Sequence, residues 1–267
     1  MGFVYFRNGI MFLKQKNFII IILLLFVSMR SFSQEGPSVM NLPKFDRAPR
    51  HFGFYVAVNQ MFFVVEPADK FQQKVWNRDQ IPDLVADSAR VIGIESSPVP
   101  GFSIGLVSNL RLGEYFDLRF LPGLQFGERD LHYSIMQFSH ADSSIVNISK
   151  NINSTFIDFP LYIKYKSKRL NNFRAFVTAG ASYKIDLASS TKDKAENPST
   201  VVVKLKKHDF TGDIGVGFDF YTVYFKFSTE IKMMYGINDM IFREGNLYTD
   251  SIKKLSAKMF QISFTFE

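Results

Sequence analysis

The chain has 267 residues, 46% of them hydrophobic, and a formal net charge of +7. Thirty phenylalanines, a single tryptophan and a mean hydropathy near zero indicate that apolar residues are dispersed and not concentrated in membrane helices. A chain of this length can either bury a large core or span a membrane as a barrel. The absence of cysteine excludes disulfides, a cysteine metal site and a lipidated N-terminal cysteine.

One apolar run is concentrated, the segment FIIIILLLFV at residues 18–27. Ten apolar residues are too few for a membrane helix. The run follows Lys14 and Lys16 and precedes small residues, a pattern typical of a secretory signal peptide. We therefore expect a signal peptide over 1–33, cleaved near Ser33, with an uncleaved anchor as the alternative. Met1 and Met11 are both candidate start residues.

Much of the positive charge belongs to this leader. Residues 1–33 hold four basic and no acidic side chains, so their removal lowers the formal net charge from +7 to +3. The remaining Lys and Arg are interspersed with acids, and the sequence therefore gives no case for a nucleic-acid partner.

The segment after the leader differs from everything that follows it. Residues 34–50 carry three prolines and no apolar period, which predicts an N-terminal arm on the periplasmic side. From His51 onward the chain alternates apolar and polar residues in short runs, beginning with Phe52, Phe54 and Val56. We expect the barrel to occupy 51–267.

Alternation is clearest in residues 208–232. Phe210, Ile214 and Phe218 face one way in the first half, while Asp213 and Asp219 face the other. The pattern restarts after a very short connector. Such alternation predicts strands with one apolar and one polar face, and two of about ten residues form a hairpin that can cross a bilayer.

Similar runs recur along the chain. The predicted strands are 52–59, 101–112, 116–127, 157–165, 173–187, 208–220, 223–232 and 257–266. Their connectors alternate between long and short, with long loops expected at about 66–100, 129–153, 188–206 and 235–255. An even strand number with alternating connector lengths predicts an all-β, eight-stranded antiparallel up-and-down barrel in the outer membrane of a Gram-negative envelope.

The charged residues fall on the polar faces of these strands and include acids and bases in turn, for example Arg119, Asp158, Lys164 and Glu230. Eight strands enclose a lumen that side chains just fill. We therefore expect a filled lumen of mutually neutralising charges. The alternative is a soluble, lipocalin-like barrel, in which the apolar faces would point inward.

Only one loop offers candidate catalytic groups. The second long loop contains His132, His140, Asp142, Ser143 and Ser144, which could in principle form a nucleophile, base and acid arrangement. Nothing in the sequence fixes their geometry, and no spacing resembles a metal-coordination loop. We expect no enzymatic activity, no cofactor and no metal.

Three segments carry a resemblance to a known family. They are NLPKFDRAPRHFGF at the arm, FIDFPLYIKYKSKRLNNFR around the fourth strand, and GVGFDFYTVYFKFSTEIKMMYGI at the hairpin. Together they resemble the PorT (SprT) family of outer-membrane components of the type IX secretion system, in the same order and over most of the mature chain. The resemblance implies an eight-stranded outer-membrane barrel needed to secrete proteins that carry C-terminal sorting domains.

That resemblance implies a non-enzymatic assembly or docking component. Its expected partners are other type IX secretion proteins and outer-membrane lipid, and no small-molecule substrate is expected. Two alternatives are a small porin or OmpX-like barrel, which would conduct, and a membrane-embedded hydrolase.

The expected partner-binding surfaces are those that barrel closure does not need. The predicted residues are Asn41, Leu42, Pro43, Phe45, Asp46 and His51 in or beside the arm, and Lys166, Lys168 and Arg169 in a basic turn. Two alternatives remain: the arm tucks into the barrel mouth and seals it, and the basic turn meets lipid head groups.

Overall fold

The computed structural model describes residues 39–81, 84–139, 142–188 and 203–267. The predicted signal peptide, both candidate start residues and the first part of the arm lie outside these ranges. Met40–Glu267 forms one compact unit by its internal contacts.

This unit is an antiparallel β structure with eleven strands in its described part, not the eight predicted. Their bounds are β1 Arg50–Pro67, β2 Trp76–Asn77, β3 Ser88–Ser97, β4 Val99–Arg111, β5 Phe116–Phe120, β6 Gly123–Ser139, β7 Asp142–Lys166, β8 Phe173–Asp186, β9 His208–Tyr221, β10 Lys226–Gly236 and β11 Ile252–Phe266. Three short 3-10 helices, η2 Phe45–Arg47, η3 Phe71–Gln73 and η4 Arg78–Gln80, and the single α-helical turn α2, Leu247–Asp250, complete the elements.

Two features account for the three additional strands. The predicted third strand is interrupted between Phe120 and Gly123, where Pro122 lacks the N–H that a ladder needs, so it becomes β5 and β6. The other two, β2 and β3, fold within the first long connection and pair with each other, and β3 also pairs with β6.

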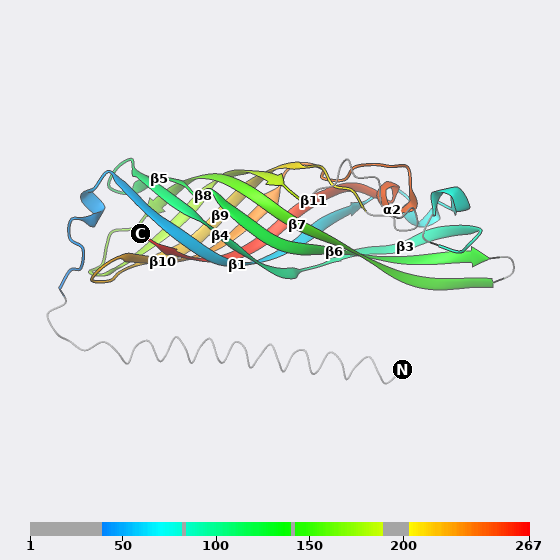
Figure 1. The fold of residues 1–267 in the computed structure, drawn as a ribbon, viewed down its shortest axis with the longest axis horizontal. Helices are drawn as coiled ribbons and strands as arrows, with labels where there is room; N and C mark the ends of the chain where they lie inside the picture. The colour runs from blue at the N-terminus through cyan, green and yellow to red at the C-terminus, as the bar shows by residue number, and fades with distance from the viewer. Residues whose placement is uncertain (1–38, 82–83, 140–141, 189–202) are drawn as a thin grey trace, which may run out of the picture. The chain divides into compact units, whose positions relative to one another are not determined.

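The strand pairings close into a ring. β1 pairs with β11 on one side and with β4 on the other, so that Phe54 lies opposite both Phe266 and Leu106. From β4 the ring continues through β5 and β6 to β7, and then through β8, β9 and β10 back to β11. In Figure 1 the ring strands lie side by side, and β6 and β7 run on beyond the ring together with β3.

Side-chain burial alternates along the ring strands as predicted. On β9, Ile214, Val216 and Phe218 are exposed, whereas Asp213 and Asp219, which flank them, are buried. The β9–β10 hairpin pairs over Lys226–Gly236. Polar faces point inward and apolar faces outward, which is the reverse of the soluble, lipocalin-like alternative.

Short and long connectors alternate around the ring, but the described parts of the long ones contain more secondary structure than predicted. The short ones lie at 112–115, 167–172 and 222–225, all at one end. At the other end, residues 129–153 continue as the β6–β7 hairpin and not as a loop. Apolar and polar residues still alternate in this segment, although less regularly than in the ring strands, so the two strands continue to pair. Ile135 lies opposite Val146, and Leu131 lies opposite Lys150.

The long connections share a hydrophobic core, which we call the cap. Its buried members are Phe63, Trp76, Ile81, Ala86, Ala89, Val91, Leu131, Tyr133, Ile135, Ile152, Val203, Leu205, Met240, Ile241, Leu247, Tyr248, Ile252 and Leu255. The free energy gained by burying eighteen side chains offsets the conformational entropy lost when the long connections become ordered. Among the described residues, no helix has the length and apolar character needed to cross a membrane.

Candidate functional site

The arm folds back onto the end of the ring that carries the short turns, which we call the mouth. Leu42 adopts a left-handed conformation with φ 47°, and the backbone N–H of Phe45 donates to its carbonyl at 3.1 Å. This turn leads into η2, whose residues Phe45, Asp46 and Arg47 are followed by extended backbone at Ala48. The turn places the side chains of Phe45 and Asp46 against the barrel.

The Asp46 carboxylate binds three groups from the barrel. Arg169 Nη1 lies 3.2 Å from Oδ2, Arg174 Nη1 lies 3.2 Å from Oδ1, and the Tyr221 hydroxyl donates to Oδ1 at 2.8 Å. Partial burial would raise the pKa of this carboxyl, but the tyrosine hydrogen bond and the two guanidiniums outweigh it. The pKa of Asp46 therefore lies below its usual value.

Arg169 also holds the backbone of the arm. Its guanidinium donates to the carbonyls of Asn41 and Leu42 and stacks over the Tyr221 ring, 3.5 Å from the ring centroid. The backbone N–H of Asn41 donates to Asn172 Oδ1 at 2.8 Å, and the Asn41 side chain donates to the Tyr221 carbonyl at 3.0 Å. A single arginine thus connects the arm to two turns of the barrel.

Phe45 occupies an aromatic and cationic setting beside this carboxylate site. Its ring stacks on His51 with centroids 3.9 Å apart and meets Tyr221 edge to face at 6.1 Å. The Lys226 ammonium lies 4.9 Å from the centroid of the Phe45 ring. Cation–π and stacking contacts of this kind give an aromatic side chain a defined position.

The structure brings most of the predicted partner-binding residues together, but the arm residues contact residues of the barrel instead of presenting a shared open surface. Asn41, Leu42, Phe45 and Asp46 contact the barrel, as in the alternative in which the arm seals the mouth, and Arg169 is their main anchor. The other four predicted residues beside the arm and in the turn do not share one role. His51 stacks on Phe45, Pro43 is exposed, Lys168 is exposed, and Lys166 turns inward to pair with Asp117 at 2.6 Å.

Two residues that bind Asp46 were not among the predicted partner-binding residues, although Arg174 was recognised as part of the basic cluster at the turn. Arg174 follows the basic turn and belongs to the same run of positive charge, so its proximity to Arg169 is a signal that the sequence contains. Tyr221 ends β9, and no pattern in the sequence marks it, because its partner Asp46 is 175 positions away.

Behind the mouth, the lumen is filled by buried charged side chains of both signs, as predicted. In the described ranges, inward-facing charged side chains number eight basic and eight acidic. The basic ones are Arg119, Arg129, Lys164, Lys166, Arg174, Lys184, Lys226 and Lys232, and the acidic ones are Asp117, Asp158, Asp186, Asp209, Asp213, Asp219, Glu230 and Glu267. Close pairs include Lys164 with Asp219 at 2.8 Å and Lys226 with Glu267 at 2.6 Å.

Hydrogen bonds between charged and neutral groups complete the lumen. Asp213 accepts from the Tyr162 hydroxyl at 2.7 Å and from Thr211 Oγ1 at 2.6 Å, and it also accepts from Ser182. Gly215 makes room here, because a Cβ at its position would lie 2.7 Å from the Thr178 hydroxyl oxygen. Gly215 and Gly217 of β9 therefore serve close packing, as expected for a crowded interior.

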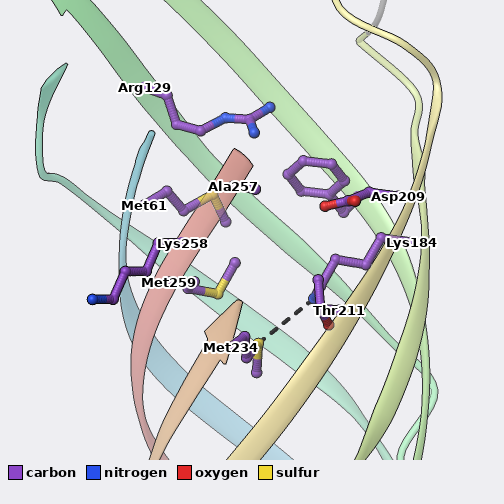
Figure 2. Close-up of a pocket in the computed structure, with 10 residues that line it drawn as sticks. Met61, Arg129, Lys184, Asp209, Thr211, Met234, Ala257, Lys258 and Met259 are labelled. Carbon is purple, nitrogen blue, oxygen red and sulfur yellow. Dashed lines mark hydrogen bonds between the residues drawn. The ribbon is translucent and has the colours of Figure 1, made fainter. Parts of the chain in front are cut away.

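A small cavity lies among charged and methionine side chains inside the barrel (Figure 2). Its volume is about 20 Å³, enough for roughly one water molecule. Met61, Met234 and Met259 lie on one side of it, with Asp209 and Lys184 on the other. Lys184 donates to the Met234 sulfur at 3.6 Å. The cavity is too small to form a continuous path through the barrel.

The predicted catalytic candidates are not brought together. His132 lies between two serines, with Nε2 2.8 Å from Ser97 Oγ and Nδ1 2.8 Å from Ser149 Oγ. On β7, Ser149 is seven residues from Asp142, a separation of about 23 Å along a strand. His140 lies outside the described residues. Within the described ranges, no three His, Asp or Glu side chains cluster as metal ligands would.

A closed antiparallel ring with an apolar exterior and a charged interior defines the class of outer-membrane β-barrels. The family described as outer membrane protein beta-barrel domain matches residues 32–241, and the chain belongs to that family. The protein is therefore an outer-membrane protein. No curated protein sequence matches it.

Solved structures of two barrels from Pseudomonas aeruginosa are among those similar to this chain. The outer membrane protein OprG is 12% identical, with 80% of this chain and 94% of that chain covered and a TM-score of 0.35. The N-terminal β-barrel domain of OprF is 13% identical, with 79% and 96% covered and a TM-score of 0.29.

Proposed function

We propose that this protein is a non-enzymatic component of type IX protein secretion, in which it assembles or docks the machinery that exports proteins with C-terminal sorting domains. The observation that carries the proposal is the filled lumen, closed at the mouth by the arm and at the other end by the cap. A barrel without a passage acts through its surfaces. The type IX assignment rests on the three sequence segments that resemble the PorT family.

In this proposal the transmembrane barrel is eight-stranded, because β5 and β6 run along one side of the ring as a single interrupted strand. β2 and β3 belong to the cap and not to the wall. The exposed apolar side chains of the ring, such as Phe102, Leu161 and Val216, contact outer-membrane lipid.

The partners we propose are other type IX secretion proteins. They meet the barrel at the mouth, where the arm and the turn at 167–172 present polar groups on the periplasmic side. No nucleic acid, cofactor or small-molecule substrate takes part. Short turns and both chain ends lie on the periplasmic side in outer-membrane barrels, which sets this orientation.

A porin role is the second candidate, and the lumen contacts argue against it. An open pore needs a hydrated channel, whereas here Arg119, Lys164 and Asp219 are almost fully buried by their neighbours. Removing one member of such a buried pair typically costs about 3–5 kcal/mol, so the pairs do not separate readily to admit solutes.

Two measurements test the proposal together. Deletion of the gene that encodes this protein should abolish export of a reporter that carries a C-terminal sorting domain, and re-expression of the protein should restore export. The purified barrel should give no steady conductance in a planar bilayer. Unimpaired export after deletion would overturn the secretion role, and regular single-channel steps would favour the porin.

The hydrolase alternative has its own outcome. It requires turnover of a test ester or peptide by the purified barrel, and it requires that His132→Ala or His140→Ala abolish that turnover. We expect no turnover above the level of an empty-membrane preparation.

A further inference from the structure

The two arginines at the mouth differ from the other inward-facing bases in their partners. Lys166 and Lys226 are paired with acids of the barrel itself, Asp117 and Glu267. Among the described residues, the only carboxylate within 4 Å of Arg169 or Arg174 belongs to the arm. Without the arm, both guanidiniums would face the mouth unneutralised.

The two arginines and Tyr221 are arranged for a carboxylate. Their donors divide between the two oxygens of Asp46, with Arg169 on Oδ2 and both Arg174 and the Tyr221 hydroxyl on Oδ1. Arg169 is fixed in place by its stacking on the Tyr221 ring. Guanidiniums held rigidly around one position bind carboxylates more strongly and selectively than flexible lysines do.

A second position beside the carboxylate site accepts an aromatic ring. His51, Tyr221 and Lys226 surround Phe45, and all three belong to the barrel strands. These groups would remain if the arm moved away. The mouth is therefore shaped for an aromatic residue followed directly by an acid.

The arm is held in a way that allows its release. None of the residues in η2 is fully buried, and η2 is a single turn. Leu42 adopts a left-handed conformation that is unfavourable for a residue with a bulky side chain. Segments with few buried apolar contacts open at low free-energy cost, and local strain of this kind often marks functional segments.

We propose that the mouth is a receptor for a peptide segment of a protein partner in which an aromatic residue precedes an aspartate or glutamate, and that Phe45 and Asp46 of the arm occupy it in cis. The partner segment displaces the arm, and its carboxylate takes the position of Asp46 between Arg169 and Arg174. This proposal rests on the docking role proposed above for the existence of a partner.

The test uses the full chain in lipid nanodiscs and a fluorescein-labelled peptide of residues 40–50, MNLPKFDRAPR, as the probe. In wild type the tethered arm competes with the peptide at a high effective concentration. The double variant Phe45→Ala/Asp46→Ala removes that competitor, and we expect it to bind the peptide at least about tenfold more tightly by fluorescence anisotropy.

Two controls define the chemistry of the site. A peptide with asparagine in place of its aspartate should bind the double variant at least about tenfold more weakly. Adding Arg174→Gln to the double variant should weaken binding similarly, whereas adding Lys253→Gln, which removes an exposed positive charge at the cap end, should not. Retention of the barrel fold is checked by the heat-dependent shift in gel mobility.

Equal affinity of wild type and the double variant would overturn the receptor, as would equal binding of the two peptides. Failure here is distinguishable from failure of the secretion role. Tight, carboxylate-dependent peptide binding together with unimpaired export after deletion of the gene would support the receptor and contradict the secretion role. No peptide binding together with lost export would contradict the receptor and support the secretion role.

Discussion

The two ends of the barrel are closed by different physical means. The cap closes the long-connector end with eighteen buried, mostly apolar side chains that come from β1, β2, β3, β6, β7, α2, β11 and their connections. The arm closes the mouth with hydrogen bonds, ion pairs and ring contacts, and none of the residues in its helical turn is fully buried.

This difference teaches which end can open. Hydrophobic burial is non-directional and cumulative, so the cap is stable as a unit and loses stability by degrees. The closure at the mouth depends on the geometry of a few polar groups, chiefly Arg169 and Asp46, so it can be lost through one change of charge or one competing carboxylate. We expect the cap to be permanent and the arm to be exchangeable.

The largest expected effect breaks the cap. Leu255→Ala removes a fully buried side chain from the cluster that contains Trp76, and should cost about 2–5 kcal/mol. Trp76 is the single tryptophan of the chain, so its fluorescence during urea unfolding in a fixed detergent reports on the cap alone. The transition should move to lower urea concentration.

The matched control is Leu170→Ala, in the turn between β7 and β8 at the mouth, where the side chain is 69% exposed. It should leave the transition of Trp76 unchanged within about 0.5 kcal/mol. Equal shifts in both variants would show that the two ends unfold as one unit.

The next largest effect concerns the wall between the ends. Val216 is 56% exposed near the middle of β9 and faces the lipid, with Val177 and Ile231 opposite it on the adjacent strands. Val216→Arg should cost about 2–4 kcal/mol, because a charge there enters the apolar core of the bilayer. Equilibrium unfolding from lipid vesicles measures this cost.

Val223→Arg tests whether the cost of an introduced arginine depends on its depth in the membrane. Val223 is 64% exposed in the short turn at the mouth, where charged substitutions cost about 0–1 kcal/mol. Similar costs at both positions would contradict the outward facing of β9.

The amino-acid sequence predicts the wall of the barrel much better than its ends. Alternation with period two survives in every ring strand because lipid on one side and packed charges on the other restrict each position, as at Asp219 and Phe218. The interruption at Pro122 leaves the inward phase intact, since Arg119, Leu121 and Gln125 are all buried. The described part has eleven strands and not eight because Pro122 divides one strand of the wall and because β2 and β3, outside the wall, carry no such restriction.

The cap was not predicted, and docking of the arm in the mouth was expected only as an alternative, because both depend on contacts between residues far apart in the chain. Trp76 and Tyr248 join one core across connections that contain many polar residues, and no local period identifies their packing. The arm residues were singled out from the sequence as unusual, yet their contacts with Arg174 and Tyr221 depend on the closure of the ring. The sequence pattern indicates which face of a strand a residue lies on. Which distant residue it contacts depends on the order in which the strands pair around the ring.

A smaller free-energy change is expected when the arm loses its main anchor, Arg169. Arg169→Ala removes the contacts to Asn41, Leu42 and Asp46, and should weaken arm docking by about 1–3 kcal/mol, the range for hydrogen bonds to charged groups. Hydrogen exchange of η2 amides should accelerate about tenfold or more. Lys168→Ala, in the neighbouring exposed residue, should leave the exchange unchanged, and acceleration in both variants would contradict a specific latch.

The smallest effect is a pH dependence confined to acid conditions. The folded-state pKa of Asp46 lies below its unfolded value of about 3.9, so its contribution to docking is fully present above that value and is lost as pH falls through the lower, folded-state pKa. A spin label at Lys44→Cys, the single cysteine in the chain, should show constant arm mobility from pH 7 to pH 5 and greater mobility below about pH 4. Asp46→Asn should remove this pH dependence. Loosening between pH 7 and pH 5 would instead identify His51, which stacks on Phe45, as the group that controls the arm.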